Sequence, residues 1–267
     1  MKNIMKNKLK LLLLVREVTS RLPRIKGLGI ILALIASAFR RQNLPDIEVS
    51  VFGKKMLLRP SDLIGSYLIF TPQWFDYRER KFIQNILLKG DYVIDVGANI
   101  GAYTLILADL VGSSGMVTAI EAEQENAKQL RHNVNINNMH WVNVHNLGVS
   151  DKKEVLSLLL NSTGNAGGHS FYEQSDTKQP PVQEVQCRPL SELIDNAKKP
   201  KLMKLDIEGF EFRVLRKYFD DIPNYQWPKF ILLEDDPLRR EADAVSLVLS
   251  SGYKIIERFD YNVFLGR

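Results

Sequence analysis

The sequence predicts an α/β protein built on a seven-stranded, mostly parallel sheet with helices on both faces. Two observations predict this class. From residue 91 onward, short apolar runs alternate with segments in which apolar residues recur at helical spacing. Near the C-terminus, two apolar runs are separated only by Asp260 and Tyr261, which leaves room for a hairpin but not for a crossover helix. The sheet should therefore finish in an antiparallel pair of strands.

The elements follow in chain order. Apolar runs rich in β-branched residues predict strands at 92–96, 117–121, 141–146, 202–207, 230–235, 253–259 and 262–266. Helical spacing of apolar residues predicts helices at 102–111, 124–137, 211–219 and 239–251. An insertion at about 151–190 interrupts the alternation. It should contain strands at 154–160 and 182–188, joined by a loop rich in glycine and serine.

Three segments make up the chain. Residues 1–45 form a basic, partly apolar helical extension. Residues 46–90 contain an apolar–polar alternation around Gly53, which predicts a β-hairpin, and then a helix over 77–90 that stops at a glycine. Residues 91–267 form the ligand-binding domain, which holds the sheet and its insertion.

The charge is distributed unevenly. Residues 1–41 hold ten Lys or Arg and one Glu, whereas the whole chain has a net charge of only +5, so residues 42–267 are net acidic. A nucleic-acid-binding protein usually carries its basic patch on the folded domain. We therefore expect no nucleic-acid partner. The single cysteine, Cys187, excludes an internal disulfide and fits a reducing compartment, so we expect a cytoplasmic location.

The extension holds two apolar runs, at 11–15 and 27–39. The first predicts no more than a helical turn. The second would reach about 20 Å as a helix, against roughly 30 Å for a bilayer core, so a full span is not expected. It either packs on the domain or on a partner subunit, or it lies at the inner face of a membrane with the basic residues of 1–41 against anionic lipid. The Ala-Ser-Ala at 36–38 resembles a signal-peptidase site, but the positive region before it is too long for a signal peptide.

The segment "DYVIDVGANIGAYTLILADLVG" reads as a strand, a glycine turn and a helix that together bind a nucleotide-like ligand. The Gly-x-Gly-x-x-Gly arrangement of dinucleotide-binding turns is absent, because Asn99 stands between Gly97 and Gly101, so a nicotinamide-dependent reductase is disfavoured. The strand ends on Asp95, which repels a pyrophosphate but attracts the cation of S-adenosylmethionine. Asp-x-Gly-x-x-x-Gly after a strand is a pattern that holds this ligand, and the glycines let the backbone approach it.

A second acid, Glu121, follows the next strand and is placed to bind both ribose hydroxyls. The alternative is that Glu121 is an ordinary acid at the start of a helix. The third strand leads to a small loop that would cover the adenine. The predicted cofactor-binding residues are Asp95, Gly97, Asn99, Gly101, Tyr103, Glu121, Asn146, Leu147 and Gly148.

The stretches "VIDVGANIGAYTLILADLVGSSGMVTAIEAEQENAKQLRHNVNINN", "VNVHNLGVSDKKEVLSLLL", "LMKLDIEGFEFRVLR" and "ILLED" resemble the FkbM family of S-adenosylmethionine-dependent methyltransferases over about 80–265. The resemblance implies a class I methyltransferase (Rossmann-like) fold and methylation of a hydroxyl oxygen on a sugar, glycan or secondary metabolite. The chain departs from the family at Ala122, where a proline is more common, and at 234–236, where three acids replace one.

Methyl transfer to a hydroxyl requires removal of its proton or its coordination by a metal. The candidate catalytic residues are Asp206, Glu208, His169 and Glu234. The two acids of "KLDIEGFE" should share one face of a strand end, and Glu234 ends the next strand. Four oxygen donors there, Asp235 included, would also suit Mg²⁺ or Ca²⁺.

Each candidate also has a structural reading. Asp206 or Glu208 could cap the following helix, the acids at 234–236 could form a solvated turn, and His169 could belong to a linker. A second hypothesis, from another class, is an inactive methyltransferase-like binding or scaffold module tethered to a membrane. Product formation with a hydroxylated acceptor would separate the two hypotheses.

Overall fold

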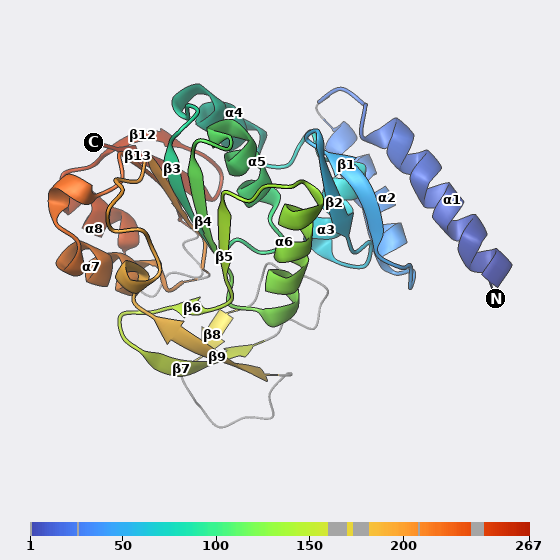
Figure 1. Cartoon of the computed structure of the whole chain (residues 1–267). Helices are drawn as coiled ribbons and strands as arrows, with labels where there is room; N and C mark the ends of the chain where they lie inside the picture. Colours follow the sequence, from blue (N-terminus) through green and yellow to red (C-terminus); the bar gives the residue numbers. More distant parts are fainter. Residues whose placement is uncertain (1, 26, 160–169, 173–181, 208, 236–242) are drawn as a thin grey trace. The chain divides into compact units, whose positions relative to one another are not determined.

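The computed structural model describes residues 2–25, 27–159, 170–172, 182–207, 209–235 and 243–267 (Figure 1). The chain divides into two compact units. One is centred on Met1–Phe82, and the other comprises Ile83–Leu160 and Gly168–Arg267.

The second unit contains a seven-stranded sheet, as the sequence predicts. Its strands are β3 (Tyr92–Val96), β4 (Met116–Ile120), β5 (Val142–His145), β10 (Leu202–Leu205), β11 (Phe230–Glu234), β12 (Lys254–Arg258) and β13 (Asn262–Gly266). They lie in the order β12-β13-β11-β10-β3-β4-β5. The pairs from β5 to β11 are parallel, and β13 is antiparallel to both β11 and β12. The expected terminal hairpin is thus confirmed.

Helices cover both faces of this sheet. These are α5 (Ala102–Val111), α6 (Gln124–Ile136), α7 (Glu211–Asp221) and α8 (Ala244–Ser250). The first two lie on one side of the sheet and the last two on the other (Figure 1). Every residue of β3 and β10 is buried, because a central parallel strand is covered from both sides. Because β3, β4, β10 and β11 are parallel, their carboxyl ends lie at the same edge of the sheet.

Two predicted elements end at least two residues earlier than expected. The helix predicted over 77–90 is α4 (Tyr77–Ile86), because the N–H of Leu88 donates to the carboxylate of Asp91 instead of continuing the helix. The strand predicted over 202–207 ends at Leu205, because the N–H of Ile207 donates to the carboxylate of Glu211 and the chain turns. For the helix predicted over 239–251, the described part starts after Asp243, whose carboxylate accepts from the N–H of Ser246.

The insertion forms a four-stranded sheet in the order β6-β9-β7-β8. The strands β7 (Glu154–Leu159) and β9 (Val182–Arg188) match the predicted ones. The short strands β6 (Gly148–Val149) and β8 (Ser170–Tyr172) were not expected from the sequence. Two 3-10 turns, Leu190–Glu192 and Asn224–Gln226, lie in the connections on either side of β10.

The first unit contains α1 (Lys2–Thr19), α2 (Leu28–Arg40), α3 (Leu63–Phe70) and a hairpin of β1 (Ile47–Val51) and β2 (Lys54–Leu58). Phe52 and Gly53 form the predicted hairpin turn, and both have positive φ, as a type I′ turn requires. The helix α3, whose N-cap is Asp62, was not predicted.

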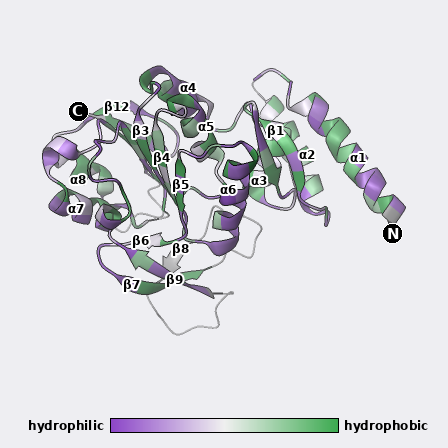
Figure 2. Ribbon diagram, viewed as in Figure 1, coloured by the Kyte–Doolittle hydropathy of each residue, from purple (hydrophilic) through white to green (hydrophobic). Residues whose placement is uncertain are grey.

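The expectation of a single helical turn at 11–15 was wrong, because α1 spans 18 residues. Tertiary packing explains the difference: Leu12 and Thr19 are buried, and Gln73 donates from its amide to the carbonyls of Thr19 and Leu22 at the helix end. Figure 2 shows hydrophobic and hydrophilic residues alternating along α1. None of the described helices is both long enough and apolar enough to cross a bilayer.

Candidate active site

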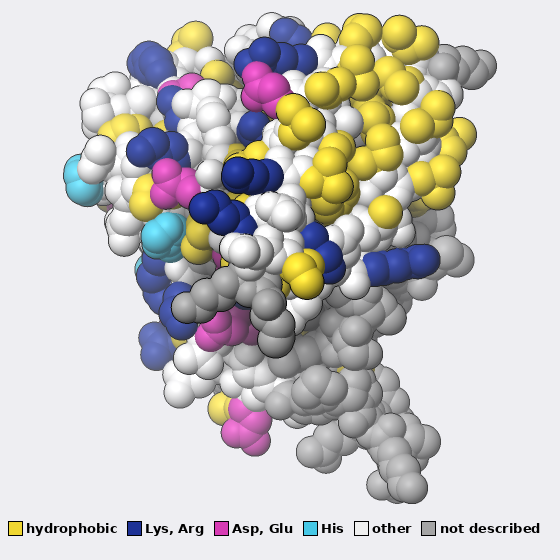
Figure 3. Space-filling model, turned by 90° about the vertical axis from the view of Figure 1, so that its right-hand side faces the viewer, with side chains coloured by type: hydrophobic (Ala, Val, Ile, Leu, Met, Phe, Trp, Pro, Cys, Tyr) yellow, Lys and Arg dark blue, Asp and Glu magenta, His cyan; other side chains and the backbone are white. Residues whose placement is uncertain are grey.

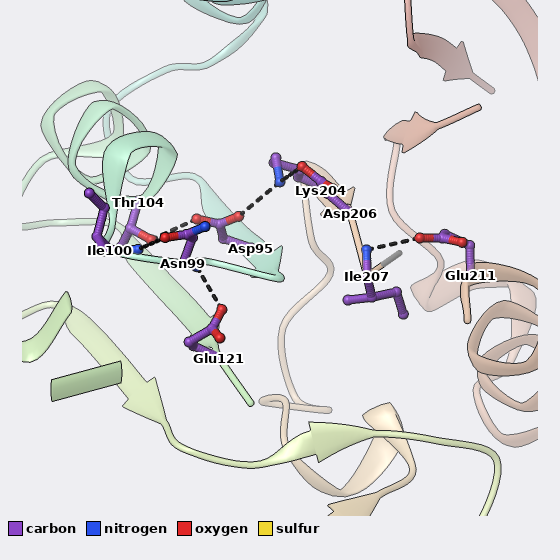
Figure 4. A network of polar contacts seen from close by, with 9 residues as sticks. All are labelled: Asp95, Asn99, Ile100, Thr104, Glu121, Lys204, Asp206, Ile207 and Glu211. Carbon is purple, nitrogen blue, oxygen red and sulfur yellow. Dashed lines mark hydrogen bonds and ion pairs between the residues drawn. The ribbon is translucent and has the colours of Figure 1, made fainter. Parts of the chain in front are cut away.

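Asp95, the penultimate residue of β3, has no solvent exposure. One carboxylate oxygen accepts a 2.6 Å hydrogen bond from the Thr104 hydroxyl (Figure 4). The other accepts no hydrogen bond from the described residues, and the ammonium nitrogen of Lys204 lies 3.9 Å away. Burial raises the pKa of Asp95, while Lys204 and the Thr104 hydroxyl lower it. Asp95 is therefore a fully buried carboxyl group with one hydrogen bond and one long ion pair among the described residues.

The glycine turn brings two strand ends into contact. A Cβ atom on Gly97, whose φ is +77°, would lie 1.8 Å from the carbonyl oxygen of Asp206. A Cβ atom on Gly101 would lie 2.7 Å from the Leu130 side chain of α6. Asn99 also has a positive φ of 50°, and its side-chain oxygen accepts from the N–H of Ile100. Any side chain at position 97 would push the turn away from the end of β10.

Glu121 connects the first two strand ends. Its carboxylate accepts hydrogen bonds from the N–H of Asn99, at 2.7 Å, and from the N–H of Glu123, at 2.9 Å. Burial, the largest influence, raises the pKa of Glu121 to about 7, against the pull of these two bonds. The cap of α6 is Glu123, which accepts from the N–H groups of Glu125 and Asn126. Glu123 thus fills the helix-start role that was the alternative for Glu121. The Glu121 carboxylate can still accept further hydrogen bonds.

Asn146 holds the loop after β4 in place. Its amide donates to the carbonyls of Glu121, at 3.0 Å, and of Ala122, at 3.1 Å. The next residue, Leu147, packs against the core of the sheet, and Gly148 is buried at the start of β6. The residues predicted to cover an adenine therefore surround the end of β5 and support the loop that carries Glu121.

Lys204 occupies the centre of the site but was not among the residues predicted from the sequence. Its side chain is only 5% exposed, and its ammonium nitrogen lies 3.0 Å from the carboxylate of Asp206. The same nitrogen lies 5.1 Å from the ring centre of Tyr103. A lysine inside the apolar run "LMKL" was the available signal, because a lysine in a central strand is rarely buried without an acidic partner.

The strand ends of β10 and β11 bring Asp206 and Glu234 together. Burial first, and then the negative charges of Asp206 and Glu211, raise the pKa of Glu234 to about 9. The side chain of Asp206 is 40% exposed, so this carboxylate is accessible to an incoming molecule. Asp235 is directed elsewhere, because its carboxylate pairs with Arg258 at 2.7 Å.

The structure does not support the expectation that Asp206 and Glu208 share one face of a strand. Since β10 ends at Leu205, the alternation of side chains stops before both residues. The N-cap residue of α7 is Phe210, which makes no side-chain cap bond, and Glu211 in the first turn accepts from the N–H groups of Ile207 and Gly209 in the preceding loop. Glu208 and His169 lie outside the described residues. Among the residues that are described, no cluster of three or more His, Cys, Asp or Glu side chains could hold a metal ion.

The assembled site is acidic. Lys204 interacts with Asp95, Asp206 and Glu234, while Glu121 interacts with Asp95 and Glu211 with Asp206. Burial raises the pKa values of four of these acids, Asp95, Glu121, Glu211 and Glu234. A positively charged ligand would relieve this repulsion, whereas a pyrophosphate would add to it. The site is therefore suited to a cationic cofactor.

Comparisons with known proteins identify the same family. A family model described as "Methyltransferase FkbM domain" matches residues 95–255. No curated protein matches the chain. Among solved structures, a methyltransferase FkbM from Methylobacillus flagellatus KT is 17% identical with a TM-score of 0.45, covering 90% of this chain and 60% of its own. The chain thus spans less than two thirds of that protein's length.

Two other solved structures are similar at comparable levels. A S-adenosylmethionine-dependent O-methyltransferase from Thermotoga maritima is 18% identical with a TM-score of 0.43, covering 84% of this chain and 78% of its own. A tRNA (uracil-54, C5)-methyltransferase from Pyrococcus abyssi, in complex with S-adenosyl-L-homocysteine, is 13% identical with a TM-score of 0.47, covering 84% and 44%.

The family match and the geometry agree. The matched residues contain the glycine turn, Glu121, the Lys204–Asp206 pair and Glu234. Because the match extends over more than half of the chain, the protein belongs to the FkbM family of S-adenosylmethionine-dependent methyltransferases.

Proposed function

We propose that this protein transfers the methyl group of S-adenosylmethionine to a hydroxyl oxygen of a small molecule, such as a sugar, a glycan or a secondary metabolite. The observation that supports it is the acidic edge of the sheet, where Lys204 and Asp206 stand beside the buried Asp95. The net acidic character of residues 42–267 favours such an acceptor over nucleic acid.

The cofactor fits the residues at the first two strand ends. Glu121 would accept from the ribose hydroxyls, because each of its oxygens uses one hydrogen bond so far and a carboxylate accepts about four. The side chain of Asp95 is fully buried, so it would attract the methionine amine through its charge and not by direct contact. The loop from Asn146 to Gly148 would cover the adenine.

When bound, S-adenosylmethionine supplies an electrophilic methyl group. The acceptor hydroxyl must lose its proton as the new oxygen–carbon bond forms and the sulfur–methyl bond breaks, with S-adenosylhomocysteine as the leaving group. Asp206 is the residue that we assign to take the proton. The ammonium nitrogen of Lys204, 3.0 Å away, would hold the Asp206 carboxylate in place for this role. Glu234, with its raised pKa, would carry a proton at neutral pH and could donate a hydrogen bond to the acceptor oxygen. Glu208 and His169 remain proposed assistants.

For the location, we propose the cytoplasm, with peripheral contact at the inner face of a membrane through residues 1–41. The basic and partly apolar composition of that segment supports it.

The test is formation of S-adenosylhomocysteine with a panel of hydroxylated sugars and metabolites. With a suitable acceptor, Asp206→Asn should lower turnover by about 10²–10⁴-fold while the affinity for S-adenosylmethionine, measured by titration calorimetry, changes little. Asp220→Asn, an exposed acid on α7, is the matched control and should be fully active.

Other outcomes separate the alternatives. Loss of turnover on chelation, with recovery on adding Mg²⁺, would assign the acids to a metal. Normal turnover of Asp206→Asn that also survives chelation would exclude both versions. Binding of S-adenosylmethionine without product from any acceptor would favour an inactive binding module.

A further inference from the structure

The helix α2 is apolar on all sides, but only one side is covered. Leu32, Ala36 and Phe39 are buried, and the ring of Phe39 packs on Phe70 of α3 with 4.9 Å between centroids. On the opposite side, Ile30, Ile31 and Leu34 are 71%, 57% and 67% exposed. A helix that is hydrophobic all round is normally buried all round. The outer side of α2 is therefore a surface that something covers.

The helix α1 has a second exposed stripe. Its inner side is marked by the buried Leu12 and Thr19. The exposed apolar residues of α1 at helical spacing are Ile4, Leu11, Leu14 and Val18, each at least 52% exposed. Their steps of seven, three and four residues place them along one side of the helix. The stripe runs through most of the 18 residues of α1.

We call these residues of the two helices the apolar face; they are Ile4, Leu11, Leu14, Val18, Ile30, Ile31 and Leu34. Figure 3 views the side of the molecule that carries α1 and α2, and hydrophobic side chains gather there with Lys and Arg side chains beside them. Scattered exposed apolar residues need no explanation, but a contiguous group marks an interaction site.

The charge around the apolar face selects its partner. Residues 1–41 contain ten Lys or Arg against one acid, Glu17, and that acid already pairs with Arg21. A second copy of the chain on the same face would bring two strongly basic surfaces together, which is unfavourable. Anionic lipid headgroups would neutralise the basic residues while the acyl boundary takes up the apolar side chains.

We propose that the apolar face of α1 and α2 lies in the surface of a bilayer that contains anionic lipid. The helices rest parallel to the membrane, since α2, at 13 residues, has a length of only about 20 Å. Binding combines burial of the apolar side chains with attraction of the Lys and Arg side chains, so it requires both the hydrophobic residues and the anionic lipid. The inference rests on the peripheral membrane contact proposed above and does not depend on which acceptor the enzyme methylates.

The experiment is flotation of the full chain with vesicles of phosphatidylcholine alone or mixed with phosphatidylglycerol. The chain should float with the mixed vesicles only, and added salt should weaken binding because it screens the attraction. The double variant Ile30→Glu, Leu34→Glu should lower the partition coefficient at least about tenfold, since both apolar contacts are lost.

A matched control separates local from overall charge effects. Leu88→Glu with Val155→Glu adds the same two charges at positions that are 66% and 61% exposed in the second unit. It should float like the unchanged chain. Circular dichroism should show both variants folded, because all four positions are exposed.

Three outcomes would overturn the proposal. They are no flotation of the unchanged chain, equal flotation of the two double variants, and a dimer in light scattering that Ile30→Glu, Leu34→Glu dissociates while vesicle binding is absent. The last would assign the apolar face to a second copy of the chain.

Discussion

The ammonium group of Lys204 lies 3.0 Å from the carboxylate of Asp206, on a strand whose residues are all buried. The same ammonium group lies 3.9 Å from the carboxylate of Asp95. A single lysine thus compensates one fully buried carboxylate and one that is partly open to solvent. Its removal takes away the ion pair that each of them makes with a described residue, whereas an exposed ion pair loses little.

We therefore expect Lys204→Met to destabilise the fold. The loss should be about 3 kcal/mol, the lower end for breaking a buried pair, because Asp206 is partly exposed. Urea unfolding followed by circular dichroism measures it. Lys217→Met, which breaks the exposed 2.6 Å pair with Asp221, is the control and should leave the unfolding midpoint nearly unchanged. Equal midpoints for both variants would mean that Lys204 has no role in compensating the buried acids.

Glu121→Ala should weaken binding of S-adenosylmethionine by on the order of 2–4 kcal/mol, because a two-point hydrogen bond to a charged group is lost. Titration calorimetry gives the value, and Glu125→Ala, an exposed acid in the first turn of α6, is the control. S-adenosylhomocysteine has the same ribose without the sulfonium charge, so its affinity should fall equally. A loss confined to S-adenosylmethionine would assign Glu121 to the sulfonium, and no loss at all would exclude the ribose contact.

Gly97→Ala should lower the stability of the protein by more than the cost of placing an alanine at a positive φ. A Cβ atom on Gly97 would meet the Asp206 carbonyl at 1.8 Å, whereas a Cβ atom on Gly252, with φ of +92°, would have nothing within 4 Å, so Gly252→Ala is the matched control. Both variants lose about 1 kcal/mol from the positive φ, and Gly97→Ala should lose about 1–3 kcal/mol more from steric overlap. Thermal unfolding measures both. Similar losses would mean that the two strand ends can separate freely.

The pH dependence of stability should report on Glu234. Its pKa in the folded protein, about 9, lies above its ordinary value of 4.5, so the folded state holds more protons than the unfolded state between these values. Raising the pH through this window should therefore destabilise the protein, by at most about 1.4 kcal/mol per pH unit. Glu234→Gln resembles the protonated form, so its advantage over the unchanged chain should grow as the pH rises.

Thermal midpoints of the two proteins across that window give the comparison. Glu257→Gln, on the edge strand β12, is the control and should follow the unchanged chain at every pH. Parallel curves for Glu234→Gln and the unchanged chain would show that Glu234 is ionised at neutral pH.

The sequence alone determined the sheet and predicted which of its edges binds the ligand. The helix at 102–111 and the strands at 92–96 and 262–266 match the structure residue for residue, because continuous apolar runs and glycine stops are local signals. The spacing of Asp95, Gly97 and Gly101 likewise depends on one strand and one turn. The resemblance to the FkbM family rested on those stretches, and the family match includes them.

Only the tertiary structure decided how the charges of the site are arranged. Lys204 pairs with Asp206, Glu123 takes the helix cap beside Glu121, and Asp235 pairs with Arg258, although it adjoins Glu234 in sequence. Leu12 is buried within a run where sequence spacing predicted a single turn. Each of these outcomes depends on burial and on a partner far along the chain or across a turn. Such energies arise when separate segments pack together, so no local pattern of residues encodes them.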